Sequence, residues 1–556
     1  MTLLLTSVFG PYGVDDEYGE KENKMELFHN QVTREQGIFS YRFNHGSQGL
    51  YFLAENVDMP TAVLDFPSFK RFKKELKKGY DYVGISFIIP NFKKAREMAR
   101  AVRELSPKSK IILGGHGVNI PNIESMIEHD FICKGEGVYY LRELFKENVH
   151  KPIKHPLGYS SFNRQVMGAP WAPDSGILIT GVGCANRCRF CATSHFFGTY
   201  VPYLKTGKEI FDLCCRYEEE MHVTDFGVLD ENFLKMKDRA LELLDLMERN
   251  QRRFTFAIFS SAETLKELGD LDILVRLGVT FIWVGVESKN VLYAKNKNTD
   301  FQVLFSGLKK RGISVLASSI LFNEEHDKKT IWEDVDYVTS LKPDYVQFAP
   351  LGPIPGTKLY EDYEEQGKVI HDIPYRSQHG QGKIWFRHDH FSREESEDFL
   401  RLAFEIDYNR NGASMLRGMR TTLNGYAYCR NHPDEAVRRR SEGFKKRLKI
   451  MRYFLTASTI FVQNRQSEIL LREIKKSFRS ELGSTKALGL ALSLLVVCYS
   501  VKEYLRCRLV GDARMPKTSY RPVNRERMKG VKPARAPEVM KVASKAAYGW
   551  SEQSGH

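Results

Sequence analysis

The first 150 residues alternate between short apolar runs and amphipathic stretches of helix length. Residues 82–89 and 110–115 are apolar runs that predict buried strands, and residues 91–105 have the spacing of an amphipathic helix. Alternating strands and helices predict a doubly wound parallel sheet, because parallel strands need a crossover connection. We therefore predict an α/β fold whose first domain covers residues 1–150.

A second series of strand and helix units occupies residues 170–370. Six apolar runs are separated there by amphipathic stretches that are long enough for helices. The predicted strands comprise residues 177–180, 226–233, 254–260, 281–288, 315–322 and 345–351. Because α/β folds bind ligands at the carboxyl ends of their strands, polar side chains at these ends are the candidates for a site.

From residue 391 onward the pattern becomes helical, and we predict a C-terminal helical domain over residues 391–510. Ser392 begins a capping box before a periodic apolar stretch. The uncharged run 487–501 is shorter than the roughly 20 apolar residues of a membrane-spanning helix, so it predicts a buried helix. A basic amphipathic stretch over residues 444–478 precedes it, and peripheral contact of these helices with a membrane stays open as an alternative.

The composition is that of an ordinary soluble protein and allows about three or four domains. Apolar residues make up 42% of the 556 positions, and charged residues make up 27%. The amino terminus has no basic segment before its apolar run. We therefore predict a first β-strand there instead of a signal peptide, and a cytoplasmic protein.

The net charge of +14 is concentrated partly at the C-terminus. Residues 511–556 contain ten Lys or Arg, four Asp or Glu and four prolines, with little periodicity. We predict a flexible basic tail over this range. A solubilising role is favoured over contact with an anionic membrane surface. No RNA-binding motif accompanies the charge, so we predict no nucleic-acid partner.

Three cysteines, Cys184, Cys188 and Cys191, follow the first strand of the second series with a CxxxCxxC spacing. Structural zinc sites and electron-transfer cubanes take four protein ligands, whereas this loop offers three thiolates. A four-iron cluster on three thiolates keeps one iron open for another ligand. The alternative is a Cys3His zinc site completed by His195. The other six cysteines show no second ligand spacing and are predicted to be buried thiols.

With the aromatic Phe190 before its last cysteine, the loop resembles that of the radical S-adenosylmethionine (SAM) superfamily. The resemblance implies a [4Fe-4S] cluster whose open iron chelates SAM and whose reduced form cleaves it to a 5′-deoxyadenosyl radical. It also implies that residues 170–370 form the partial (β/α)6 barrel of that superfamily.

Several polar residues at the predicted strand ends match positions of this superfamily. Asp230 and Glu231 occupy the place of the motif that holds the amino group of SAM, and Glu287 matches the residue that contacts its ribose. Ser260 and Ser318 are weaker candidates at the barrel mouth. The alternative for Asp230 and Glu231 is an acidic pair at a helix N-terminus.

The first domain resembles the cobalamin-binding domain of the cobalamin-dependent branch of the superfamily. The residues that match positions cradling the corrin and its nucleotide tail are Ser86, Gly114, Gly115, Gly135, Glu136 and Gly137. The DxHxxG motif that supplies a histidine to cobalt is absent, and His116 is predicted to be structural. A fold that has lost cofactor binding is therefore the alternative for this domain.

The resemblance as a whole implies a cobalamin-dependent radical SAM enzyme that methylates an unactivated carbon. Its expected partners are a small-molecule or lipid substrate and an external electron donor such as flavodoxin or ferredoxin. One alternative is a cobalamin-linked cyclase or rearrangement enzyme without methyl transfer. Another is a non-catalytic iron–sulfur scaffold or sensor.

Overall fold

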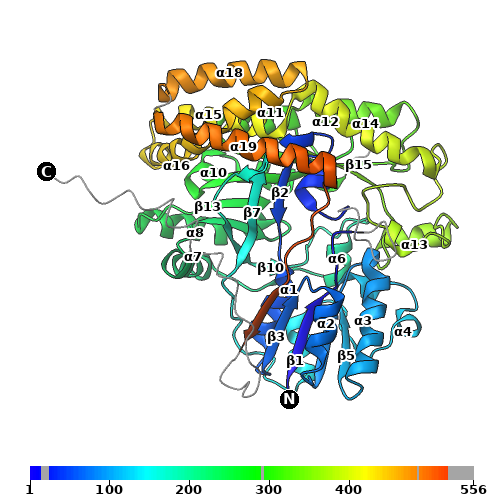
Figure 1. The fold of residues 1–556 in the computed structure, drawn as a ribbon. Coiled ribbons are helices and arrows are strands. Elements are labelled where there is room, and N and C mark those ends of the chain that lie inside the picture. Colours follow the sequence, from blue (N-terminus) through cyan, green and yellow to red (C-terminus); the bar gives the residue numbers. More distant parts are fainter. Residues whose placement is uncertain (14–23, 290–292, 485–486, 524–556) are drawn as a thin grey trace.

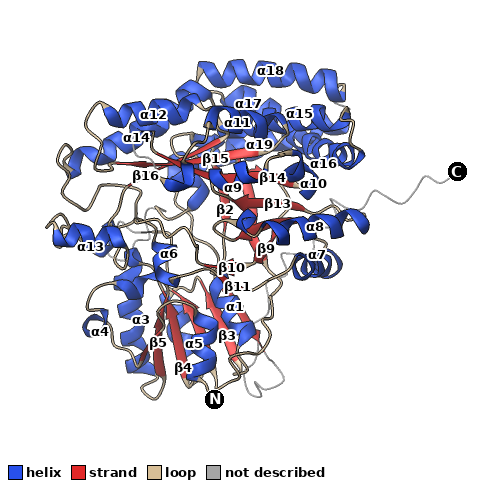
Figure 2. Cartoon of the chain, turned by 180° about the vertical axis from the view of Figure 1, so that it is seen from behind, coloured by secondary structure: helices blue, strands red, loops and turns tan. Residues whose placement is uncertain are grey.

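The computed structural model describes residues 1–13, 24–289, 293–484 and 487–523. Three layers follow one another along the long axis of the molecule (Figure 1). An α/β domain lies at the bottom of the view, a curved sheet lies in the middle, and a group of helices covers the top. Seen from behind, α6 (Ala192–Phe197) and the short strand β10 (Gly181–Val182) lie between the α/β domain and the curved sheet (Figure 2).

The N-terminal domain contains the predicted parallel sheet. Its strands lie in the order β17-β3-β1-β4-β5-β6, and all pairs except β17 with β3 are parallel. Helices on each side bury separate apolar clusters against the two faces of the sheet. The bounds are β1 (Leu3–Ser7), α1 (Gln48–Asn56), β3 (Thr61–Asp65), α2 (Phe69–Leu76), β4 (Tyr82–Ser86), α3 (Phe92–Leu105), β5 (Lys110–Gly114), α4 (Ile123–Met126), β6 (Phe131–Ile132) and α5 (Gly137–Leu144).

The six predicted strands of the second series form neighbouring parallel strands of one curved sheet. This confirms the partial α/β barrel. The strands are β9 (Ser175–Ile179), β12 (Asp225–Leu229), β13 (Thr255–Phe259), β14 (Val279–Glu287), β15 (Ser314–Leu321) and β16 (Tyr345–Pro350). The accompanying helices include α7 (Gly207–Met221), α8 (Lys237–Arg249), α9 (Ala262–Leu268), α10 (Asp272–Leu277), α11 (Phe301–Lys310), α12 (Thr330–Ser340) and α13 (Lys358–Glu365).

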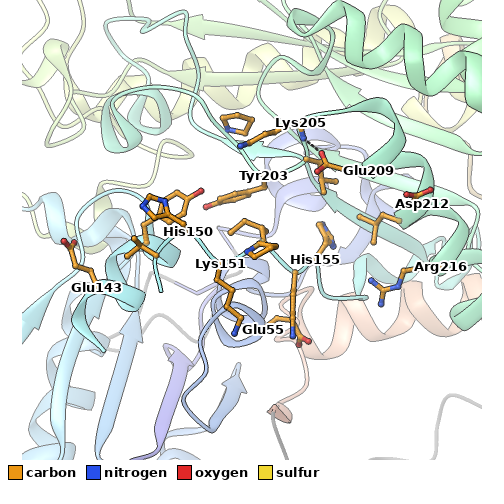
Figure 3. A pocket seen from close by; sticks show the side chains of 18 residues that line it. Glu55, Glu143, His150, Lys151, His155, Tyr203, Lys205, Glu209, Asp212 and Arg216 are labelled. Atoms are coloured by element: carbon orange, nitrogen blue, oxygen red, sulfur yellow. Dashed lines mark hydrogen bonds between the residues drawn. The ribbon is translucent and has the colours of Figure 1, made fainter. Parts of the chain in front are cut away.

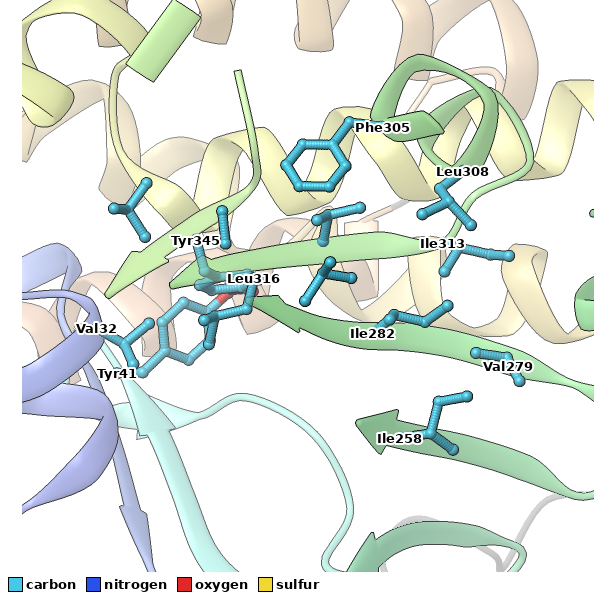
Figure 4. Packing of buried hydrophobic residues seen from close by; sticks show 14 of the residues in the cluster. Val32, Tyr41, Ile258, Val279, Ile282, Phe305, Leu308, Ile313, Leu316 and Tyr345 are labelled. Carbon is cyan, nitrogen blue, oxygen red and sulfur yellow. Dashed lines mark hydrogen bonds between the residues drawn. The ribbon is translucent and has the colours of Figure 1, made fainter. Parts of the chain in front are cut away.

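One side of the barrel sheet is packed against these helices. Ile258, Ile282 and Ile313 lie together with Phe305 and Leu308 of α11 in a continuous apolar core (Figure 4). Side chains alternate between the two faces of a strand, so the neighbouring positions point to the opposite, inner side.

Two antiparallel strands extend the barrel sheet beyond β9. Strand β7 (Tyr159–Val166) pairs with β9, and β2 (Tyr41–Asn44) pairs with β7. The Tyr345 hydroxyl of β16 donates to the Tyr41 hydroxyl over 3.1 Å, and the Phe28 ring lies 6.3 Å from the Tyr345 ring. Residues 28–44 therefore belong to the barrel and not to the single domain expected over residues 1–150, because their apolar side chains are buried against the barrel.

The C-terminal part is helical, and the capping box at Ser392 is present at the start of α14. The helices are α14 (Arg393–Asn411), α15 (Ser414–Arg430), α16 (Glu435–Met451), α17 (Phe454–Phe461), α18 (Arg465–Leu482) and α19 (Ala487–Val510). By length and composition α19 is the one described helix that could cross a membrane, and 22% of its apolar window is buried. The prediction of a buried helix over residues 487–501 is wrong, since Leu494 is 62% exposed.

The prediction of a flexible tail over residues 511–556 is also wrong for residues 519–523. Residues 519–523 form β17 (Ser519–Val523), which pairs with the edge strand β3 in antiparallel register. An edge strand has unpaired backbone groups, and an extended segment with apolar Tyr520 and Val523 satisfies them. The segment runs from α19 in the upper layer to the sheet of the lower domain (Figure 1). Residues 524–556 lie outside the described residues.

Candidate active site

The cysteine loop begins where β9 ends, as the sequence predicts. Gly183 has φ +81°, and a Cβ there would collide with the Thr199 carbonyl oxygen, so the position requires glycine. The loop then turns, with the Cys191 amide donating to the Cys188 carbonyl over 2.9 Å, and continues into α6. The three cysteines therefore lie at the carboxyl edge of the barrel sheet.

All three thiols of the loop are half-buried and unpaired. Burial raises the pKa of Cys184 and of Cys188. The charges of Cys188 and Cys191 add to the effect at Cys184, and that of Cys191 adds to it at Cys188. No three His, Cys, Asp or Glu side chains of the described residues converge on a point that one metal ion could occupy. A cluster does not need such convergence, because each thiolate binds its own iron.

Arg189, between the second and third cysteines, anchors the loop to the far side of the barrel. Its guanidinium donates to Asp362 over 2.9 Å and to Glu324 over 2.8 Å, and its carbonyl accepts from the Leu359 amide over 3.0 Å. Sequence reasoning missed this residue, because both carboxylates are more than a hundred positions away along the chain.

The two acidic residues that follow β12 have different surroundings in the structure. The Asp230 carboxylate is buried and accepts from Thr180 over 2.7 Å, from Tyr200 over 2.7 Å and from Arg239 over 2.8 Å. Its hydrogen-bonding capacity is thus used within the protein. It does not cap α8 either, because that helix begins at Lys237 with Met236 at its N-cap position.

Glu231, the next residue, is exposed and lies beside the cysteine loop, where its charge contributes to the raised pKa of Cys184. Although Glu231 keeps accessible surface, the protein packed around it raises the pKa of its carboxyl, and Asp230 adds to this effect. Of the acidic pair, Glu231 is therefore the member available to a ligand.

Glu287 ends β14 in a left-handed backbone conformation, with φ +64°. Such a conformation is unfavourable for a residue with a side chain and is often found at functional sites. The Glu287 carboxylate is buried and paired with Lys295, while its carbonyl accepts from the Ser319 hydroxyl over 2.8 Å.

Lys295 connects this carboxylate to the cysteine loop. Burial opposes the charge on its ammonium group, but Glu287 and the thiols of Cys188 and Cys191 outweigh burial and raise its pKa. The ammonium also lies 5.9 Å from the Phe190 ring, which meets the Tyr293 ring edge-on at 5.5 Å. Sequence reasoning missed Lys295, whose segment shows no motif, and the fold alone brings it to the site.

The two serine candidates differ in their surroundings. Ser260 follows β13, is buried and donates to Asn232 over 3.4 Å. Ser318 is half-buried in β15, opposite Gly285 of β14 and Gln347 of β16. Ser318 points away from the outer helices, since its strand neighbour Ala317 is fully buried in the core. Ser318 therefore lines the inner side of the barrel.

Aromatic rings share this inner side. Phe259 and Trp283 are half-buried and stack at 5.1 Å with an angle of 25° between their planes. The half-buried Phe281 lies 5.7 Å from Tyr345 and 6.4 Å from Phe28. The inner side of the barrel is thus largely apolar and aromatic, in contrast to the charged edge beside the cysteines.

The candidate residues of the N-terminal domain lie at the carboxyl edge of its sheet. Ser86 and Gly114 end β4 and β5 and are half-buried. Gly115 has φ +82°, and a Cβ there would lie 2.5 Å from the Phe87 carbonyl oxygen. Gly135 has φ +85°, and its Cβ would lie 3.4 Å from the Phe196 carbonyl oxygen of α6. This edge therefore faces the helix that follows the three cysteines of the loop.

Glu136 and Gly137 have structural contacts at the start of α5. The Glu136 carboxylate caps this helix by accepting from the amides of Val138 over 2.9 Å and Tyr139 over 2.7 Å. It also accepts from the Tyr203 hydroxyl, which joins the two α/β layers. A Cβ on Gly137 would lie 3.0 Å from the Leu53 side chain.

His116 packs at the same edge, with its ring stacked on Phe196 at 4.5 Å. Burial lowers the pKa of this histidine. Its position agrees with the structural role that the sequence predicts.

A cavity of about 1040 Å³ lies elsewhere, between the N-terminal domain, the linker around Lys151 and helix α7. Figure 3 shows His155, Tyr203 and Glu209 on its walls, together with acidic and basic side chains. None of Cys184, Cys188 and Cys191 lines it, nor does any other residue proposed for the site from the sequence. The cavity is therefore separate from the candidate active site.

No protein-family model matches the chain. Over 327 residues, the chain is 27% identical to the bacteriochlorophyllide d C-8(2)-methyltransferase of Chlorobaculum tepidum, covering 52% of this chain and 70% of that protein. An uncharacterized methyltransferase of Pyrococcus horikoshii is 22% identical over 366 residues, which are 59% of this chain and 79% of that protein.

The fold is similar to that of the radical SAM methyltransferase TsrM from Kitasatospora setae, solved with cobalamin and a [4Fe-4S] cluster bound. The TM-score is 0.52 at 16% sequence identity, and the match covers 81% of this chain and 98% of that one. The chain thus has the fold of a radical SAM methyltransferase. The resemblance in fold to the cobalamin-binding branch of that superfamily is confirmed.

Proposed function

We propose that this protein is a radical SAM enzyme that uses cobalamin to methylate an unactivated carbon of a small molecule. The observation that carries the proposal is the cysteine loop at the carboxyl edge of the barrel. It presents three free thiols next to an exposed carboxylate and a buried ion pair. The similarity to curated methyltransferases supports the methyl transfer.

The donor atoms at the barrel edge fit the cluster and SAM. Cys184, Cys188 and Cys191 would hold a [4Fe-4S] cluster, and Glu231 is the free carboxylate beside them for the amino group of SAM. Glu287 and Lys295 are placed to bind the remaining polar groups of SAM. When bound, the cluster and SAM supply one-electron cleavage of a carbon–sulfur bond, and cobalamin supplies a methyl group for transfer.

The protein's own contribution is to position the ligands and to exclude water. Arg189 ties the loop to Asp362 and Glu324, so the thiols are held against the barrel edge. The bonds to Asp230 hold the turn after β12 and thereby orient Glu231.

At the N-terminal edge, Ser86, Gly114 and Gly135 leave backbone accessible for cobalamin, and Gly115 shapes the turn beside them. Since DxHxxG is absent, we propose that the protein gives cobalt no histidine from that motif.

The inner side of the barrel supports an apolar substrate that contains rings. Phe259, Trp283 and Phe281 offer half-buried aromatic faces, while Ser318 and Gln347 offer polar contacts. Aromatic faces bind flat rings by stacking and by edge-to-face contact. The relative from Chlorobaculum tepidum, named for a bacteriochlorophyllide, agrees with this class of substrate.

The proposal includes a reducing, cytoplasmic environment and an external electron donor such as flavodoxin or ferredoxin. All nine cysteines lie in the described part of the chain and are free thiols. Free thiols are typical of reducing compartments, and a cluster of this kind needs electrons from outside the protein.

Anaerobic reconstitution with iron, sulfide and hydroxocobalamin tests the proposal. We expect the wild type to bind cobalamin and, with dithionite and SAM, to form 5′-deoxyadenosine; with substrate it should also form S-adenosylhomocysteine. The variant C188A should form neither product, whereas C215A, which removes a half-buried thiol of α7, should match the wild type. A reconstituted cluster that never cleaves SAM would contradict the proposal.

A further inference from the structure

Helix α19 exposes large apolar side chains and buries mostly small or polar ones. Its buried positions are Gly489, Ser493, Val496, Ser500 and Glu503, which are mostly small or polar. Most of its outward positions are apolar, with Leu494 62% and Leu509 81% exposed. We call the outward residues the apolar face of α19: Leu488, Leu490, Leu494, Leu495, Tyr499, Val501, Leu505, Leu509 and Val510.

The buried side of α19 is held firmly on the protein. The Ser500 hydroxyl donates to the Met167 carbonyl over 3.0 Å, and a Cβ on Gly168 would lie 2.6 Å from the Glu503 Cβ. Glu503 pairs with Arg506 over 2.9 Å and also with Arg514. The apolar face is therefore not a core surface exposed by a loosely attached helix.

Both ends of α19 return to the protein, which decides how it can meet a bilayer. With 24 residues the helix is long enough to span the apolar core of a membrane. However, the chain after α19 continues to β17 in the N-terminal sheet, on the same side of the molecule (Figure 1). A helix that packs on the protein along one side and returns to it at both ends lies parallel to a membrane surface.

Basic side chains flank the apolar face. Near the start of α19, Arg452 donates to the Gly483 carbonyl over 3.0 Å, and near its end Lys502 and Arg508 are exposed. Lys475 of α18 donates to Thr459 of α17. Helix α17 packs against α19 and exposes 58% of Ile460. Residues 435–510 contain seventeen Lys or Arg and six Asp or Glu.

We propose that the apolar face of α19 docks in the interfacial plane of a membrane that contains anionic phospholipids. The leucines insert among the acyl chains, and the flanking Lys and Arg contact the headgroup phosphates. A second copy of the chain is a poorer occupant, because a symmetric contact through this face would bring like charges together. This inference does not depend on the proposed chemistry.

Vesicle flotation of the full-length protein tests the docking. We expect the wild type to float with vesicles of phosphatidylcholine and phosphatidylglycerol, and at least about tenfold less with phosphatidylcholine alone. The double variant L494E/L505E should lose flotation about tenfold or more. The matched control V303E/L402E places two glutamates at exposed apolar positions of α11 and α14 and should float like the wild type.

Insertion is measured separately with a tryptophan reporter. Leu494→Trp should be quenched by brominated lipid in anionic vesicles, whereas Val303→Trp should not. Equal flotation of wild type and L494E/L505E, or no flotation of the wild type, would overturn the proposal. So would a lipid-free dimer in analytical ultracentrifugation that L494E/L505E dissociates, because the occupant would then be a second copy.

Discussion

The two parallel sheets of this protein present their carboxyl edges to the same helix, α6, but with different chemistry. The barrel edge carries three thiols, an exposed carboxylate and the buried pair of Glu287 with Lys295. The N-terminal edge carries Ser86, glycines and a stacked His116. One edge can hold a ligand by charge and metal coordination, whereas the other can hold one by close approach of backbone. Similar sheet topology therefore supports two kinds of binding.

We expect the largest effect from a substitution that disrupts the barrel edge and leaves the N-terminal edge intact. Cys188→Ala removes one of the three thiolates proposed to hold the cluster, so SAM cleavage should fall by at least about a hundredfold, since the proposed chemistry needs the cluster. Iron analysis and quantification of 5′-deoxyadenosine measure this loss. Retained cobalamin binding would show that the two edges act independently, and equal loss of both cofactors would contradict this separation.

The next largest effects are expected from substitutions of the neighbouring acidic residues Asp230 and Glu231 at the barrel edge. Asp230→Ala leaves Arg239 buried without its partner, so we expect a loss of about 3–5 kcal/mol in the free energy of unfolding. Glu231→Gln should change stability by less than about 0.5 kcal/mol. It should nevertheless weaken SAM binding about tenfold, by loss of one charge-assisted hydrogen bond.

Urea denaturation and SAM titration of the reconstituted protein separate these two effects. If Glu231→Gln destabilised the fold as much as Asp230→Ala, the assignment of a structural role to one and a ligand role to the other would be wrong.

The stability of the strand that leads into the cysteine loop should depend on pH. His155 is buried, and its Nε2 accepts from the amide of Ile179, the last residue of β9, over 2.8 Å. Burial lowers the pKa of His155 to about 4. The neutral ring therefore stabilises the fold above about pH 6.5, and this contribution of up to about 3 kcal/mol is lost as the pH falls towards 4.

Urea denaturation between pH 7 and pH 4 checks this expectation. His155→Gln keeps an acceptor for the Ile179 amide without titrating, so its stability should depend less on pH across this range. An unchanged pH profile would contradict the role of His155.

The smallest effects sharpen the description of the N-terminal edge. Gly115→Ala should cost about 2 kcal/mol, because the residue is in a left-handed conformation and its Cβ would meet the Phe87 carbonyl. Gly114→Ala has space, with the nearest atom at 3.9 Å, and should cost less than about 1 kcal/mol. If Gly114 lies against cobalamin, G114A weakens cofactor retention on gel filtration while stability stays near that of the wild type.

The amino-acid sequence alone predicted the parts of the protein that are encoded locally. The spacing of Cys184, Cys188 and Cys191 and the six apolar runs of the barrel were readable, because ligand spacing and strand periodicity are properties of short segments. The strands and helix of residues 82–114 and the capping box at Ser392 were predictable for the same reason.

Only the tertiary structure decided which of these residues are free to act. Asp230 and Glu231 look equivalent in sequence, but Arg239 and Tyr200 engage just one of them. Lys295 reaches Glu287 and the cysteine loop through the fold, without any motif of its own.

For residues 27–44 and 519–523, the sequence did not predict where the whole segment packs. Each pairs with strands far away in the sequence: β2 joins the barrel, and β17 joins the N-terminal sheet. The exposure of α19 likewise follows from which side of the helix packs on the protein. Local periodicity sets which elements form, but contacts between distant residues decide what each element covers and which side chains remain available.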